Sequence, residues 1–162
     1  MELRVLIHAP RGRDAAVVQD VIQPNHRGLI CDTPAQLVSS IMEGAGAAVI
    51  TEEALGDPML LQQLNEWLAV QPPWSDFPFI VLASRQAGPR PASAVVALHA
   101  MGNVILLERP LNAETLLSAA DAAVRARRRQ YVTREHLDQL TRTQSEVEKL
   151  NSELEHRIEE RT

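Results

Sequence analysis

The stretch Asn103-Val104-Ile105-Leu106-Leu107-Glu108-Arg109-Pro110-Leu111 decides the fold of this chain. It opens as an apolar run without polar alternation, which is typical of a strand buried on both faces of a parallel sheet. Arg109 and Pro110 follow the run directly, and Asn112 can then cap a helix. The stretch therefore predicts a buried strand that leads through a short turn into a helix.

Four similar apolar runs precede this one, and helical stretches separate them. The runs are 3–7, 28–31, 47–50 and 79–82. Thr33 and Pro34 supply a cap and a first-turn proline for one of the helices, and Gly44 can end it. The alternation predicts an α/β fold of (βα)5 type: a doubly wound, parallel five-stranded sheet with helices on both faces.

The last predicted helix is unusually long, because no Gly or Pro interrupts residues 116–161. Its first part is rich in Ala and its second part is highly charged. We expect one continuous helix from about Asn112 to at least Ile158. The domain boundaries that follow are a globular domain over 1–128 and a connector helix over 129–162.

Apolar residues in the connector recur at heptad spacing, which indicates a coiled coil. The predicted seam consists of Leu137, Leu140, Gln144, Val147, Asn151, Leu154 and Ile158. A parallel homodimer is expected, since a buried Asn specifies register and two strands. A competing register places Leu140, Val147 and Leu154 at the first core position and Leu150 at the second.

Composition narrows the class of protein. The chain has 162 residues, a net charge of −5, 45% apolar residues and 3% aromatic residues. Acids and bases are mixed along the chain, which argues against a nucleic-acid partner, and the arginines at 125 and 127–129 are expected to form a solvated helix surface. The sequence shows no membrane span, so a cytoplasmic location is expected.

The segment from Leu106 to Leu111 resembles the end of the fifth strand in receiver domains of two-component signalling, over roughly residues 1–128. Receivers carry a Lys before the Pro, and this chain has Arg109 there. The resemblance implies a flavodoxin-like fold, with its site at the carboxyl ends of the strands. It also implies a cis peptide bond between Arg109 and Pro110.

The resemblance also implies a phosphorylation site whose residues are replaced in this chain. In receivers, carboxylates after the first strand hold Mg²⁺ and an Asp ending the third strand accepts the phosphoryl group. The degenerate positions are Ala9 and Pro10 for the metal ligands, Thr51 for the acceptor, Ala83 with adjacent Ser84 for the Ser/Thr, and Leu107 for the aromatic switch residue. The chain thus resembles a pseudo-receiver, with no catalytic residue, metal or cofactor expected.

Other acids near these positions leave alternatives open. Asp14 follows the first strand, and Glu52 and Glu53 follow Thr51, where acids also favour helix starts. Glu52 could pair with Arg109 as a mimic of an activated state, or the pair could be solvated. A working receiver phosphorylated on Glu52 is the first rival interpretation.

Residues 150–162 resemble the connector helices of sensor histidine kinases. The sequence therefore predicts a non-catalytic module at the N-terminus of a bacterial hybrid sensor histidine kinase, with any kinase activity in downstream domains. It would dimerise and relay a signal through the coiled coil. A scaffold or adaptor that only docks a partner is the second rival.

Overall fold

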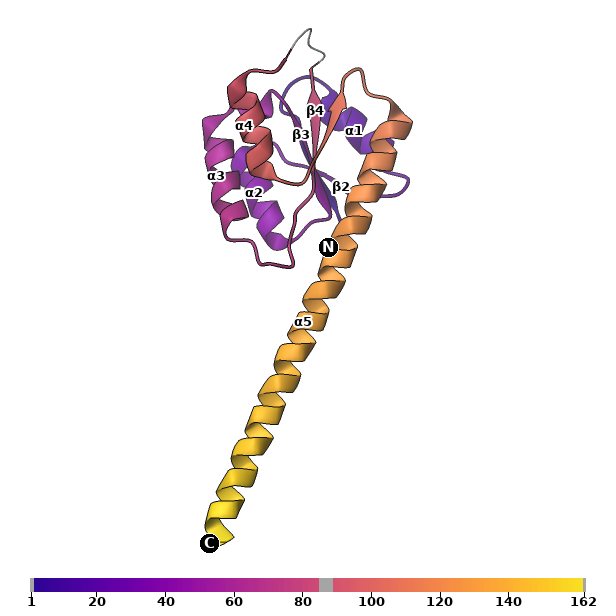
Figure 1. Ribbon diagram of the computed structural model, residues 1–162. Helices are drawn as coiled ribbons and strands as arrows, with labels where there is room; N and C mark the ends of the chain where they lie inside the picture. Colours follow the sequence, from indigo (N-terminus) through magenta and orange to yellow (C-terminus); the bar gives the residue numbers. More distant parts are fainter. Residues whose placement is uncertain (1, 85–88, 162) are drawn as a thin grey trace.

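The computed structural model describes residues 2–84 and 89–161, and within them the chain forms one five-stranded parallel sheet (Figure 1). The strands are β1 (Val5–His8), β2 (Gly28–Ile30), β3 (Ala47–Thr51), β4 (Phe79–Ala83) and β5 (Val104–Glu108). Their order is β2-β1-β3-β4-β5. In the register, Ile7 lies between Ile30 and Val49. The predicted fold class is confirmed.

Helices cover both faces of the sheet. They are α1 (Asp14–Ile22), α2 (Pro34–Glu43), α3 (Pro58–Ala69), α4 (Ala92–Met101) and α5 (Ala113–Arg161), with a short 3₁₀ turn η1 (Ala54–Gly56) before α3. α1 and α5 pack on the face that carries Val5 and Ile7, whereas α2, α3 and α4 pack on the face that carries Leu6. Because successive strand residues point to opposite faces, both faces need apolar side chains, and the strands are continuously apolar.

The predicted helix ends are confirmed in three places. The Thr33 hydroxyl accepts a hydrogen bond from the Gln36 amide at the start of α2, and α2 ends at Gly44 with φ of 112°. The Asn112 side chain accepts a hydrogen bond from the Thr115 amide at the start of α5. These caps satisfy amide groups that a helix start leaves without intrahelical partners.

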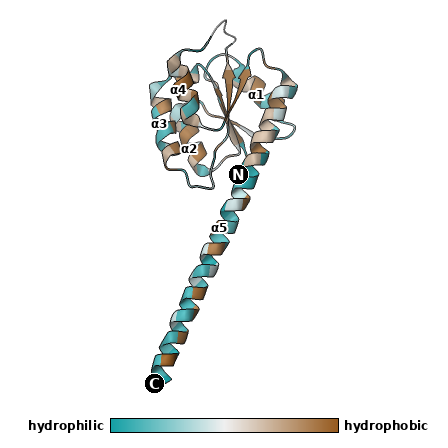
Figure 2. Cartoon of the chain, in the orientation of Figure 1, coloured by the Kyte–Doolittle hydropathy of each residue, from teal (hydrophilic) through white to brown (hydrophobic). Residues whose placement is uncertain are grey.

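α5 is a single uninterrupted helix, as the sequence predicts. Its first turns are buried against the sheet through Leu116, Ala120 and Val124. Every described residue from Glu135 onward is exposed, and Figure 2 shows this half as largely hydrophilic with separated hydrophobic residues. Figure 1 shows it projecting well beyond the sheet. None of the described helices is long and apolar enough to cross a membrane.

The expectation of a solvated arginine surface on α5 is wrong for Arg127. Arg125, Arg128 and Arg129 are exposed, but Arg127 is only 3% exposed. Contacts between α5 and the rest of the fold extend to Arg134, which forms an ion pair with Glu2. The long helix therefore remains in contact with the domain beyond residue 128.

Candidate functional site

The candidate site lies at the carboxyl edge of the sheet, where β1, β3, β4 and β5 end together. Of the predicted site residues, Ala9 and Pro10 follow β1, Thr51 ends β3, Ala83 ends β4, and Arg109 and Pro110 follow β5. The Arg109–Pro110 peptide bond is cis, as expected. The parallel topology thus gathers these positions at one edge.

Arg109 forms the centre of this edge. Its Nη1 donates to Asp14 Oδ2 at 2.9 Å, and its Nη2 forms a short ion pair with Glu53 Oε1. Nη2 also donates to Ser84 Oγ at 2.9 Å, and that hydroxyl donates to Glu53 Oε1 at 3.0 Å. The guanidinium therefore joins the start of α1 to the chain segments after β3 and β4.

The sequence left open whether Glu52 pairs with Arg109, and the structure shows a different arrangement. The Glu52 carboxylate accepts hydrogen bonds from the Ser84 amide at 2.8 Å and from Arg90 Nε at 3.3 Å. Arg109 instead pairs with Glu53. Both carboxylates accept a hydrogen bond from Ser84, Glu52 from its amide and Glu53 from its hydroxyl, and it is Glu53 that also pairs with Arg109.

The network pairs the cation of Arg109 with two carboxylates, those of Asp14 and Glu53. Burial raises the pKa of Glu53, but hydrogen bonds from Arg109, its own backbone and Ser84 outweigh that effect, so the pKa lies below its ordinary value. The hydrogen bond to Glu53 raises the pKa of Arg109. A carboxylate held by a guanidinium stays ionised. Asp14 and Glu53 each pair with the Arg109 cation through one carboxylate oxygen.

The remaining predicted positions offer little reactive chemistry. Thr51 is 3% exposed, and its hydroxyl accepts a hydrogen bond from the Ala54 amide at 3.4 Å. Ala83 is fully buried, and Leu107 is half-buried on β5. Among residues 2–84 and 89–161, no group of three or more His, Cys, Asp or Glu side chains could hold a metal ion.

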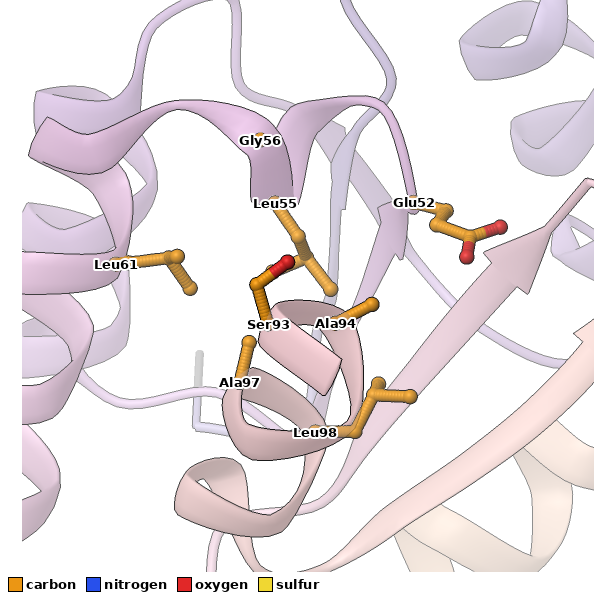
Figure 3. Close-up of a pocket in the computed structure, with 8 residues that line it drawn as sticks. All are labelled: Glu52, Leu55, Gly56, Leu61, Ser93, Ala94, Ala97 and Leu98. Atoms are coloured by element: carbon orange, nitrogen blue, oxygen red, sulfur yellow. The ribbon is translucent and has the colours of Figure 1, made fainter. Parts of the chain in front are cut away.

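A small hollow of about 240 Å³ lies beside the site, between η1, α3 and α4 (Figure 3). Its lining residues are Glu52, Leu55, Gly56, Leu61, Ser93, Ala94, Ala97 and Leu98. The Glu52 carboxylate is engaged by Ser84 and Arg90, so the hollow presents mainly aliphatic carbon.

Sequence reasoning assigned Asp14 and Glu53 to helix starts and missed their pairing with Arg109. Asp14 does begin α1, so both roles hold for this residue. Arg90 was not singled out at all. The signal that could have found the pairs is topological: the segments after β1, β3 and β5 converge, and Arg109 is the cation placed directly at the end of β5.

The second candidate site is the exposed half of α5. Its predicted seam residues remain uncovered, and Leu140 is 65%, Leu154 55% and Ile158 64% exposed. They recur on one side of a helix that is otherwise charged, which is the pattern of a coiled-coil strand. A second helix is the partner that such a narrow stripe fits.

No protein-family model matches this sequence, and no curated protein matches it. Solved structures do match the fold. One is a CheY-like response-regulator receiver domain protein from Methanospirillum hungatei, with 13% identity and a TM-score of 0.61 over 80% of this chain and 99% of that chain. The chain has the receiver fold. This fold accounts for the placement of the ends of β1, β3, β4 and β5 at the candidate site.

Two further structures extend the comparison. NtrX from Brucella abortus, solved in complex with ADP, shares 16% identity and a TM-score of 0.61 over 85% of this chain, which spans 29% of the NtrX chain. A fusion carrying the yeast Spc42 trimeric coiled coil shares 15% identity and a TM-score of 0.61 over 93% of this chain and 98% of that chain. The receiver fold with a long C-terminal helix therefore has solved counterparts.

Proposed function

We propose that this chain is a non-catalytic signalling module: a degenerate receiver domain that dimerises through α5 and relays a signal to a downstream histidine kinase. The observation that carries the proposal is the continuity of α5. One helix begins beside Arg109, packs along the sheet and then leaves the domain with an exposed heptad stripe. A helix of this kind can transmit a change at the sheet edge to whatever follows it.

The network around Arg109 supports the non-catalytic part of the proposal. Phosphoryl transfer of the receiver type depends on a free carboxylate acceptor and a metal ion held by further carboxylates. Here Asp14 and Glu53 hold a guanidinium, and Glu52 holds Arg90. The site thus resembles a receiver site fixed by internal ion pairs.

The partner assignment rests on the exposed stripe of α5 and on the likeness of residues 150–162 to kinase connectors. A second copy is the proposed partner, with the parent protein a cytoplasmic, bacterial hybrid sensor histidine kinase. Asn151 in the seam favours two strands. The fusion with the Spc42 coiled coil is trimeric by its description, so the test must distinguish dimer from trimer.

Light scattering on two versions of the chain tests the dimer. The full chain should have twice the mass of its monomer, whereas a version ending at His136 should be monomeric. That end point retains Tyr131 and Arg134, which contact the domain, so the fold stays intact. Equal monomeric masses would refute dimerisation through α5, and a threefold mass would assign a trimer.

A further inference from the structure

Arg127 is buried where α5 leaves the sheet, at the amino ends of the strands and opposite the candidate site. Its Nε donates to the Ala45 carbonyl at 3.3 Å, and its Nη1 donates to Ser75 Oγ at 2.8 Å and to Gln130 Oε1 at 2.7 Å. Ala45 precedes β3 and Ser75 precedes β4, so one guanidinium joins both connections to α5.

Aromatic rings enclose the same guanidinium. Its central carbon lies 5.3 Å from the ring centroid of Trp74, 5.1 Å from that of Phe77 and 4.7 Å from that of Tyr131. The Tyr131 hydroxyl also donates to the Ala45 carbonyl at 3.0 Å. A guanidinium ringed by π-faces gains cation–π stabilisation in a fixed orientation.

Contacts of neighbouring α5 residues also attach the helix to the domain. Gln130 accepts from the Asp76 amide at 2.8 Å and donates to the Asp76 carbonyl at 2.9 Å. Arg134 forms an ion pair with Glu2 and lies over the Tyr131 ring at 4.5 Å. Successive residues on one face of α5 are therefore tied to the domain.

Burying the charged guanidinium of Arg127 costs free energy of desolvation. The three acceptors of Arg127 are neutral oxygens, and desolvation lowers the pKa of Arg127. An apolar side chain would fill the same space without desolvating a charge. The planar guanidinium, unlike an apolar side chain, donates several hydrogen bonds in fixed directions. These hydrogen bonds specify one orientation of the helix.

We propose that Arg127 is a positioning residue that sets the rotation and tilt of α5 relative to the sheet. This inference rests on the proposed relay function, because a signal passes along α5 only if the helix is held at one angle. Loss of the guanidinium should leave the domain folded but allow α5 to adopt a range of angles.

The test measures distances between spin labels by double electron–electron resonance. Labels are attached at Met59→Cys on α3 and Lys149→Cys on α5, in a Cys31→Ala background diluted with unlabelled chain. The variants are Arg127→Met, Arg127→Lys and, as a control, Arg128→Met at the exposed neighbouring position. Thermal melting of each variant reports on the domain separately.

Arg127→Met and Arg127→Lys should each broaden the distance distribution about twofold, while Arg128→Met should leave it unchanged. Arg127→Lys keeps the charge and the apolar stem, so a merely space-filling role predicts the parent distribution for it. That result would overturn the proposal even if Arg127→Met fails to fold. The readout lies within one chain, so failure of dimerisation in light scattering is a separate outcome.

Discussion

Arg109 determines the charge state of the sheet edge. It pairs with Asp14 and Glu53 and donates to Ser84, so one side chain engages three chain segments. Because the pKa of Glu53 is lowered, the stability from this pair is fully present above the ordinary value of 4.5 and is lost as pH falls through the folded value. The network should therefore contribute to stability at neutral pH and weaken in acid.

Arg109→Met tests this contribution. The variant leaves two carboxylates without their cation, so we expect the free energy of unfolding at neutral pH to fall by about 1–2 kcal/mol. Its stability should also depend less on pH below 4.5 than that of the parent chain. Urea titrations across this pH range measure both effects, with exposed Arg11→Met as the matched control. An unchanged acid dependence would contradict the role given to Glu53.

Thr51 and the engaged acids lead to a prediction about phosphorylation. Incubation with acetyl phosphate and Mg²⁺ should leave the mass of the protein unchanged, because Thr51 is buried and Glu52 and Glu53 are held by cations. Intact-protein mass spectrometry is the measurement. A gain of one phosphoryl group that disappears in Glu52→Gln would support the rival working receiver.

For single residues, the sequence predicted their positions at the strand ends better than the side chains with which they pair. It located Arg109, Thr51 and Ser84 at the strand ends, because strand order alone fixes where chains converge. It offered Glu52 as one possible partner of Arg109 and did not find Glu53, since the direction of a side chain after a strand depends on the local turn. That information is not contained in residue spacing.

Among the elements, α5 combines two patterns on one helix. Leu116, Ala120, Ala123, Val124 and Arg127 recur at helical spacing and face the sheet. The prediction that Arg127 is solvated rested on its charged neighbours. It did not consider that Arg127 lies at the helical spacing of the buried residues. The same spacing leads on to Tyr131 and Arg134, so helical periodicity could have predicted the whole contact. The caps at Thr33 and Asn112 needed only local chemistry, and were predicted correctly.

Asn151 distinguishes the two possible registers of the coiled coil. If Asn151 lies in the core, Asn151→Ile should stabilise the dimer by about 1–3 kcal/mol, because it removes a buried polar group. If the competing register holds, that change should have little effect and Leu150→Ala should destabilise the dimer instead. Thermal melting together with light scattering separates the two cases. Stabilisation by Asn151→Ile with tolerance of Leu150→Ala is the expected result.

In the whole molecule, the candidate site lies at the carboxyl ends of the strands, whereas the exposed half of α5 leaves the domain at their amino ends. α5 connects them, since it starts just after Arg109 and Pro110 and passes Arg127 before leaving the domain (Figure 1). One continuous helix therefore runs from the candidate site to the exposed half of α5. The sequence predicted this architecture, because buried parallel strands appear as continuous apolar runs and an uninterrupted helix appears as a long segment without Gly or Pro. The fixing of α5 by a buried cation required the three-dimensional contacts.

Insertion of residues into α5 of the proposed parent kinase tests the central claim most directly. The insertion point is after His136, beyond the ion pair between Arg134 and Glu2. Four added residues change the heptad phase, whereas seven preserve it. The proposed relay predicts altered kinase output with four residues and largely preserved output with seven. Equal output from both insertions would show that α5 is a passive tether.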